Sequence, residues 1–198
     1  MPQVPEELFL KCVHMAVAQN AEFVPPADFS GSLYIRPFQF GSGCQIGLDP
    51  PDEFTFCIFV QPHIAFHGHG AIRALVAEDF DRAATRGTGN VKVGGNYAPV
   101  ARWSREAKKD GWGVLLHVDS KTQTLIDEFS TSGFIGIQGS PDASDGNNEV
   151  KLVVADSPAA IESITSSCVA ELARSFGWKV EKRPVSSAIR AHSCYRRK

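Results

Sequence analysis

The sequence predicts a protein of the α/β class. Apolar, strand-like segments alternate along the chain with amphipathic, helix-like segments, and this alternation is typical of sheets covered by helices. The chain has 198 residues, of which 43% are hydrophobic, enough for one domain or two small ones with a real core. The longest strongly apolar run, residues 54–60, is far shorter than the roughly 20 residues that cross a membrane. A formal net charge of -2 argues against a nucleic-acid groove.

The first half of the chain is expected to hold one helix and three strands. Residues 5–20 have apolar side chains at helical spacing, with Pro5 in the first turn and two glutamates at the positive end of the helix dipole. The Val-Pro-Pro run at 24–26 ends this helix. The strands expected here are residues 33–36, which Pro37 ends, residues 54–60 and residues 72–77.

The second half is expected to hold two helices and four strands. In the helix at 97–110, Asn96 is the expected cap, Pro99 lies in the first turn and Gly111 ends the helix. Residues 161–176 form an amphipathic helix with a glycine directly after it. The strands expected here are residues 114–118, 125–129, 150–155 and 178–185.

Neither cysteines nor histidines indicate a metal site. The five cysteines form no CxxC pair, and their odd number and irregular spacing favour reduced thiols in an intracellular protein, in a compartment (cytoplasmic or mitochondrial) that stays open. The first ten residues contain no secretory signal pattern. His63, His67 and His69 lie in a glycine-rich stretch without a nearby carboxylate, so we expect no metal there.

A glycine-rich segment at residues 87–97 surrounds a single lysine, Lys92. Val91 and Val93 flank it, and the triplet is strand-like, so Lys92 is expected to point opposite to its apolar neighbours. The segment is not a phosphate-binding Walker A loop, because no Ser or Thr follows the lysine and the glycine spacing differs. Two interpretations stay open, a surface lysine in a flexible turn or an amine held in a pocket as a Schiff-base nucleophile.

Two further polar pairs are candidates for binding. Tyr34 and Arg36 share one face of their strand, where a phenol and a guanidinium could clamp a carboxylate. Asp127 and Glu128 place carboxylates at a strand end. The alternatives are an ordinary exposed strand edge and a solvated acidic pair, respectively.

Four segments together resemble the branched-chain amino acid aminotransferase family, which consists of pyridoxal-phosphate enzymes of fold type IV. The resemblance covers roughly residues 1 to 185 and points to fungal members, some of which belong to pathways for peptide toxins and other specialised metabolites. The segments are LYIRPF (33–38), FDRAATRGTGNVKVGGNYAP (80–99), DEFSTSGF (127–134) and FGWKVEKRPV (176–185).

The resemblance implies which residues bind pyridoxal phosphate. Lys92 would bond the cofactor covalently and act as the base in catalysis, Tyr97 would hydrogen-bond the phenolic oxygen, and Glu128 would pair with the pyridine nitrogen. Backbone N–H groups at a helix start would hold the phosphate, because helix N-termini bind anions. The residues implied near the phosphate are Arg82, Ile164 and Thr165.

The implied reaction moves an amino group between a branched-chain or related hydrophobic amino acid and a 2-oxo acid, in a homodimer when the protein is complete. The alternatives are an inactive truncated remnant with at most a binding or dimerisation role, and a different enzyme of the same fold type, such as an aminodeoxychorismate lyase or a D-amino-acid aminotransferase. The residues implied in the substrate pocket are Tyr34, Arg36, Phe66 and Thr131.

The resemblance also implies a domain division and a truncation at both ends, since family members are roughly twice as long. Three substitutions depart from the family pattern near the cofactor: Gly133 replaces an asparagine, Ala155 a threonine and Glu162 a proline. We expect them to weaken cofactor binding. The expected division is residues 1–68 as part of a small domain, 69–80 as a linker, 81–185 as part of a large cofactor-binding domain and 186–198 as an unmatched tail.

Overall fold

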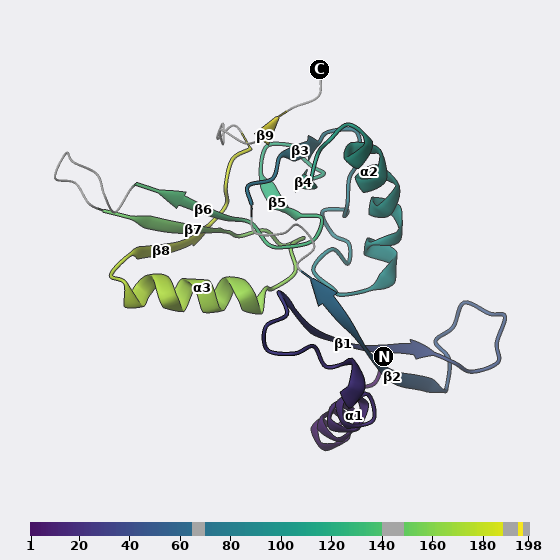
Figure 1. The fold of residues 1–198 in the computed structure, drawn as a ribbon. Helices are drawn as coiled ribbons and strands as arrows, with labels where there is room; N and C mark the ends of the chain where they lie inside the picture. The colour runs from purple at the N-terminus through teal and green to yellow at the C-terminus, as the bar shows by residue number, and fades with distance from the viewer. Residues whose placement is uncertain (65–69, 140–148, 188–193, 196–198) are drawn as a thin grey trace. The chain divides into compact units, whose positions relative to one another are not determined.

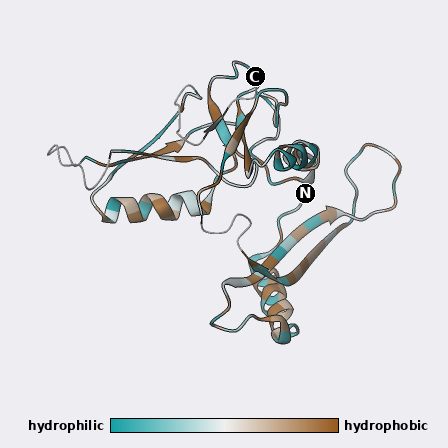
Figure 2. Cartoon of the chain, turned by 45° about the horizontal axis from the view of Figure 1, so that its top comes forward, coloured by the Kyte–Doolittle hydropathy of each residue, from teal (hydrophilic) through white to brown (hydrophobic). Residues whose placement is uncertain are grey.

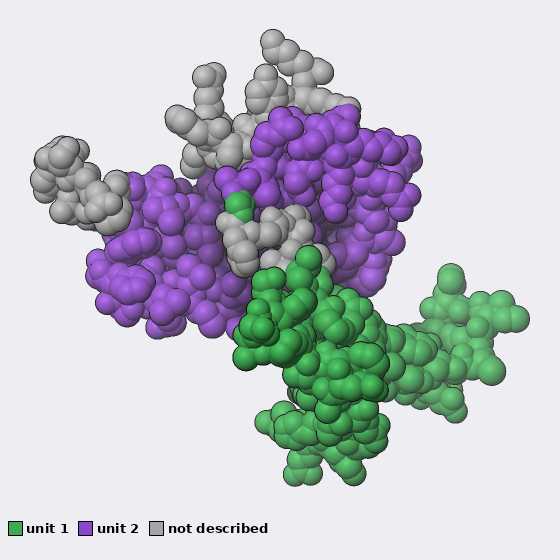
Figure 3. Space-filling model, in the orientation of Figure 1, with its two compact units in different colours: residues 1–70 green, residues 71–198 purple. Residues whose placement is uncertain are grey.

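The computed structural model describes residues 1–64, 70–139, 149–187 and 194–195. The chain is a mixed α/β protein that divides into two compact units, Met1–Gly70 and Ala71–Lys198 (green and purple in Figure 3). Each unit is described by itself.

The first unit is a helix followed by a long β-hairpin. Strand β1 (Gly31–Gly41) pairs antiparallel with β2 (Phe54–Ile64). The helix α1 (Glu6–Ala18) contacts β2, where the rings of Phe9 and Phe56 lie 5.9 Å apart. A short 3-10 turn, η1 (Ala21–Phe23), follows α1.

The prediction that Pro37 ends the first strand is wrong. β1 runs through Pro37, which pairs with Ile58 of β2. The sheet has only two strands, so β1 is an edge strand, and an edge strand can spare the N–H that proline lacks. Nothing in the sequence before residue 37 shows that the strand has one partner only.

Little of the first unit is buried. None of its described residues is in the buried class, and hydrophobic residues on α1 and on both hairpin strands face outward in part (brown in Figure 2). Phe38, Phe40 and Phe59 are each at least 40% exposed. The hairpin is therefore held by its backbone ladder and by α1 more than by a closed core.

The described residues of the second unit form two sheets and the helices α2 and α3, which are labelled in Figure 1. Helix α2 (Ala98–Lys109) contacts strand β4, and helix α3 (Ile164–Ser175) contacts β7 and β8. A 3-10 turn, η2 (Gly94–Asn96), leads into α2. One sheet has the strand order β5-β4-β3-β9, from β3 (Ala74–Ala77), β4 (Val114–Val118), β5 (Ile126–Phe129) and β9 (Cys194–Tyr195). The other has the order β6-β7-β8, from β6 (Ile135–Gln138), β7 (Lys151–Ala155) and β8 (Lys179–Arg183).

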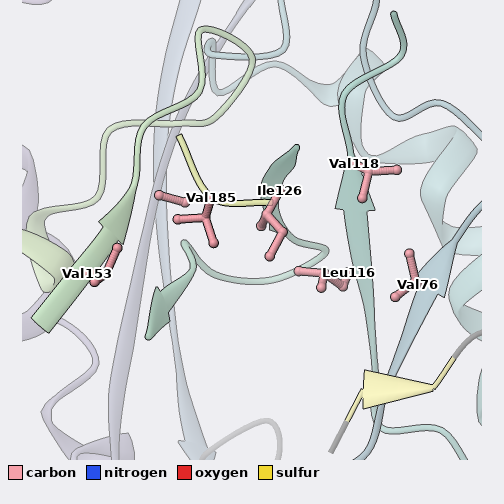
Figure 4. Close-up of a cluster of buried hydrophobic side chains, with 7 residues drawn as sticks. Val76, Leu116, Val118, Ile126, Val153 and Val185 are labelled. Carbon is pink, nitrogen blue, oxygen red and sulfur yellow. The ribbon is translucent and has the colours of Figure 1, made fainter. Parts of the chain in front are cut away.

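A buried aliphatic cluster joins the two sheets of the second unit. It combines side chains of β3, β4 and β5 with Val153 of β7 and with Val185, which is 2% exposed (Figure 4). Two smaller clusters lie under the helices, around Leu115 beneath α2 and around Leu152 beneath α3. This packing fixes β5 and the segments on either side of it, which carry the candidate site.

Most predicted elements of the second unit are present, with ends shifted by a few residues. The expected helices at 97–110 and 161–176 appear as α2 and α3, followed by Gly111 and Gly177 with φ of 79° and 78°. Strand β6 was not predicted from the sequence. The prediction of a strand-like triplet around Lys92 is wrong, because residues 91–93 belong to no strand.

Candidate active site

A β-bulge in β5 places two acidic residues at one position of the sheet. Leu116 pairs with Phe129, but Val118 pairs with Ile126, so Asp127 and Glu128 both lie opposite His117. A bulge of this kind re-aims side chains and breaks the simple alternation of a strand. Asp127 is 2% exposed and Glu128 is 6% exposed, so the alternative interpretation, a solvated acidic pair, is wrong.

Each of these carboxylates has its own hydrogen-bond partners. Oε1 of Glu128 lies 3.1 Å from Nη1 of Arg82, and Oε2 accepts the backbone N–H of Ile161 at 3.0 Å. Asp127 accepts the hydroxyl of Ser157. Burial raises the pKa of both carboxyls; for Glu128 the Ile161 N–H and the charges of Arg82 and Lys92 oppose that rise. The influence of Lys92 shows that its ammonium lies within electrostatic reach of Glu128.

Arg82 is buried, and the backbone surrounds its guanidinium. Besides the ion pair with Glu128, it donates to the carbonyl of Gly89, with Nη1 and Nη2 both at 3.3 Å, and to the carbonyl of Ala159. The structure thus gives Arg82 three protein partners.

Lys92 lies beside Tyr97. Its Nζ is 4.9 Å from the centroid of the tyrosine ring. The hydroxyl oxygen of Tyr97 is buried and has no hydrogen-bond partner among the described residues. Lys92 itself is exposed, as the interpretation of a surface lysine expects, and its role as an amine held in a pocket stays a prediction.

The loop that presents Lys92 is held by the Asn96 side chain. Its amide donates to the carbonyls of Thr88 and Val91, at 2.7 and 2.8 Å. Asn96 therefore does not cap α2 as predicted; the N-cap position belongs to Tyr97, which has no side-chain cap bond. The same contacts close the loop into turns and explain why residues 91–93 do not extend into a strand.

Helix α3 begins at Ile164, and the phosphate role that the resemblance implies for this helix start stays a prediction. Ser163 is the N-cap, and its hydroxyl accepts the N–H of Ser166 at 3.1 Å. The N–H groups of Ile164 and Thr165 occupy the first turn, where no intrahelical acceptor exists, so they are able to bind an anion. Both side chains are exposed.

A cavity of about 580 Å³ adjoins the start of α3. Asp127, Gly133 and Ser166 are among its lining residues, but Lys92, Tyr97 and Glu128 are not. A Cβ at Gly133 would lie 3.1 Å from the Ser166 hydroxyl oxygen, so the glycine keeps this space open. Lys92 and its neighbours therefore do not line this cavity.

His117 is a buried polar residue of the site region that the sequence analysis missed. It is fully buried in β4, next to the acidic bulge, and neither ring nitrogen has a hydrogen-bond partner among the described residues. Burial first, and then the charge of Arg82, lower its pKa to about 4. The signal was present in the sequence, since His117 is the single polar residue of an otherwise apolar strand.

The residues assigned to the substrate pocket belong to different parts of the chain. Tyr34 and Arg36 are neighbours on β1 of the first unit, where the guanidinium carbon of Arg36 lies 4.8 Å from the Tyr34 ring centroid. Tyr34 also contacts the His63 ring, at 5.4 Å between centroids. Thr131 is exposed in the second unit, and Phe66 lies outside the described residues. How the two sets combine in one pocket stays a prediction.

Within the part of the chain that the structure describes, no group of three His, Cys, Asp or Glu side chains could hold a metal ion. None of its helices is long and apolar enough to cross a membrane. The cysteines that it describes with side chains, Cys12, Cys44, Cys57 and Cys168, are free.

Comparison with curated proteins finds fungal aminotransferases. The chain is 67% identical over 189 residues to "Aminotransferase TOXF" of Cochliobolus carbonum, covering 94% of this chain and 52% of that protein. It is 64% identical over 188 residues to "Aminotransferase apf4" of Gibberella fujikuroi, covering 93% of this chain and 49% of that protein. The chain thus spans about half the length of these relatives. No protein-family model matches it.

Solved structures give the fold. The branched-chain aminotransferase of Thermoproteus uzoniensis with norvaline matches with a TM-score of 0.74 at 22% identity, covering 94% of this chain and 57% of that one. That of Thermobaculum terrenum, in its pyridoxal-phosphate form, matches with a TM-score of 0.71 at 21% identity, covering 95% and 57%. Over the residues that it shares with these proteins, the chain is similar to fungal aminotransferases and has the fold-type-IV architecture of branched-chain aminotransferases.

Proposed function

We propose that this chain carries the cofactor-binding lysine of a pyridoxal-phosphate-dependent aminotransferase that acts on branched-chain or related hydrophobic amino acids and a 2-oxo acid. The observation that carries the proposal is the grouping of Lys92, Tyr97 and Glu128. The lysine ammonium lies against the Tyr97 ring and within electrostatic reach of the buried Glu128 carboxyl. An amine, a phenol and a carboxylate are the groups that the chemistry of this cofactor requires.

The residues present fit the cofactor. The Tyr97 hydroxyl, buried and without a partner among the described residues, is a donor for a ligand oxygen. The first N–H groups of α3 can donate hydrogen bonds to a phosphate. Bound there, pyridoxal phosphate would supply an aldehyde that takes an amino group and a ring that accepts electrons from the substrate.

The protein groups would then divide the work. Lys92, once the substrate amine has displaced it, would take the substrate's α-proton as general base. Glu128 would hold the proton at the pyridine nitrogen, and its pairing with Arg82 favours the ionised form that this role requires. Tyr97 would donate its hydroxyl proton to the phenolic oxygen.

The substrate assignment rests on the resemblance and on the names of relatives. One solved relative was crystallised with norvaline and another with 4-methylvaleric acid, both with aliphatic chains. Arg36 and Tyr34 would bind the substrate carboxylate, with Thr131 and Phe66 near the side chain. We also propose an intracellular homodimer for the complete enzyme, in a specialised-metabolite pathway.

Chemical trapping tests the cofactor role of Lys92. The purified chain is incubated with pyridoxal phosphate, reduced with borohydride and digested, and mass spectrometry locates the modified lysine. We expect modification at Lys92, with an absorbance band that Lys92→Ala removes and Lys108→Ala, a change on an exposed part of α2, leaves unchanged. Labelling spread over surface lysines, with no band that depends on Lys92, would contradict the proposal.

The exposure of Lys92 favours one alternative, a chain that binds cofactor weakly and catalyses nothing. Assays with leucine, valine and D-alanine, each with 2-oxoglutarate, separate the possibilities. Turnover of leucine and valine supports the proposed substrates, and turnover of D-alanine alone indicates a D-amino-acid enzyme. No turnover, despite specific labelling of Lys92, indicates the alternative.

A further inference from the structure

One buried side chain, Arg82, contacts three separate segments of the second unit. Its guanidinium donates to the Gly89 carbonyl and to the Ala159 carbonyl, and it forms the ion pair with Glu128. The Arg82 and Glu128 side chains are only 3% and 8% exposed. We call these four residues the Arg82 network.

Each segment in the Arg82 network leads to a different part of the proposed cofactor site. Gly89 begins the loop that presents Lys92. Glu128 is the proposed partner of the pyridine nitrogen. Ala159 lies in the segment that enters α3, where the phosphate is expected, and the Ile161 N–H of that segment returns to Glu128 at 3.0 Å. The contacts of Arg82 and Glu128 with residues 159 and 161 therefore close a ring.

The backbone around the Arg82 network is packed too closely for an additional side-chain atom at residue 89. Gly89 is buried, and a Cβ there would lie 2.7 Å from the Ala159 carbonyl oxygen and 2.5 Å from the Ala83 Cβ. The two backbones can approach this closely only because residue 89 has no side chain. A planar guanidinium donates in several fixed directions, whereas a lysine ammonium at the same place is a flexible point charge.

We propose that Arg82 is a positioning residue that sets the spacing between the Lys92 loop, Glu128 and the start of α3. The proposal rests on the proposed function for what these segments bind. It assigns Arg82 a role other than the one the family resemblance implies, contact with the phosphate. A rigid cofactor ring needs its amine, ring-nitrogen and phosphate partners at fixed separations, and Arg82 is the side chain that contacts all three segments.

Hydrogen exchange on the cofactor-free chain tests the structural part. Arg82→Lys keeps a positive charge beside Glu128 but cannot donate to both carbonyls, so amides in residues 87–93 and 157–165 should exchange at least about tenfold faster. Arg86→Lys, an exposed change in the same loop, should leave both segments unchanged. Unchanged exchange in Arg82→Lys, or a change in one segment only, overturns the proposal.

A second variant covers the case in which Arg82→Lys unfolds the whole unit. Glu128→Gln keeps the size of the side chain and removes its charge, and it should speed exchange in the same two segments by a smaller factor. No change in either segment overturns the proposal. Because this measurement contains no cofactor, its result does not depend on whether the chain is an aminotransferase.

Cofactor binding separates positioning from direct phosphate contact. The affinities of pyridoxal phosphate and of pyridoxal, which lacks the phosphate, are compared in the unmodified chain and in Arg82→Lys. If Arg82 sets the spacing, the ratio of the affinity for pyridoxal phosphate to the affinity for pyridoxal should be about tenfold smaller in Arg82→Lys than in the unmodified chain. The same variant should show the faster hydrogen exchange. A loss of phosphate advantage without faster exchange in the cofactor-free chain overturns the proposal, because it indicates that Arg82 contacts the phosphate.

Discussion

The two units of the chain place polar groups in opposite environments. In the second unit, Glu128 and Arg82 are buried beside the aliphatic clusters and meet backbone partners at defined distances. In the first unit, Tyr34 and Arg36 lie on a hairpin whose described residues are nowhere fully buried. Glu128 and Arg82 are therefore fixed by packed structure, whereas Tyr34 and Arg36 are on a hairpin without a closed core.

This difference predicts in which unit substitutions should lower the stability of the fold. A buried ion pair held by backbone groups depends on the surrounding packing, so changes nearby should alter stability and chemistry together. Side chains on an exposed sheet face should alter binding with little effect on stability. The predictions below test this contrast.

The largest expected effect is on the core. Leu152→Ala removes a side chain that is 1% exposed, and it should lower the free energy of unfolding by about 3 kcal/mol. Phe59→Ala, on the hairpin where the ring is 48% exposed, should cost less than about 1 kcal/mol. Urea unfolding followed by far-ultraviolet circular dichroism measures both losses, whereas tryptophan fluorescence would report the second unit alone, since Trp103, Trp112 and Trp178 all belong to it. Equal losses would remove the contrast between the units.

The next effect depends on pH. The pKa of His117 is about 4 in the folded chain and 6.5 ordinarily, so the unfolded chain binds the proton more readily. The stability that neutral, buried His117 contributes is fully present above pH 6.5 and is lost as the pH falls towards 4. The loss in the free energy of unfolding amounts to about 2 kcal/mol at pH 5. In His117→Leu, the free energy of unfolding should fall by about 2 kcal/mol less between pH 7 and pH 5 than in the unmodified chain. His14→Gln, on exposed α1, should leave it unchanged. An identical pH dependence in His117→Leu would contradict the prediction.

A glycine pair sharpens the contrast within the second unit. Gly89→Ala places a methyl group against Ala83 and the Ala159 carbonyl, and should destabilise by about 2 kcal/mol through overpacking. Gly94→Ala is the matched control, because a Cβ there meets nothing within 4 Å. Thermal unfolding measures the stability of both variants. Equal stability of the two variants would contradict the prediction, because it would show that the backbone around residue 89 shifts to accommodate the methyl group.

The smallest expected effect on stability is that of Tyr97→Phe. Its hydroxyl has no partner among the described residues, so its removal should change the unfolding free energy by less than about 0.5 kcal/mol. The affinity for pyridoxal phosphate should fall about tenfold, because the donor to the phenolic oxygen is lost. Tyr34→Phe in the first unit should leave cofactor affinity unchanged. Titration followed by cofactor absorbance measures both variants, and equal affinities would remove Tyr97 from the site.

The sequence predicted elements whose signals are local. Helices α2 and α3 are marked by the glycines that follow them, and the apolar run of β4 predicts a buried strand. The predictions that failed depend on contacts distant in sequence. β6 is defined by its pairing with β7, and the loop around Lys92 by the Asn96 side chain rather than by backbone preference.

In the candidate site, too, some residues are indicated by local sequence and others only by contacts between distant parts of the chain. Lys92, Tyr97 and Glu128 follow from motif resemblance, because their types and order are visible in the sequence. The partners of Arg82 are not, since Glu128 and Ala159 reach it only through the fold. For Lys92 the sequence left two interpretations open, surface lysine or pocket amine, because exposure depends on what packs above the loop.

The β5 bulge has a consequence for how this chain can diverge. Since two acids share one cross-strand position, two separate contacts leave β5 at the same point: Asp127 accepts the Ser157 hydroxyl, and Glu128 holds Arg82 and the Ile161 N–H. A lineage that replaced the acid at 128 would keep the contact with Ser157 but would leave the buried Arg82 without its ion-pair partner. Deleting one residue here would leave a single acid where both contacts now begin.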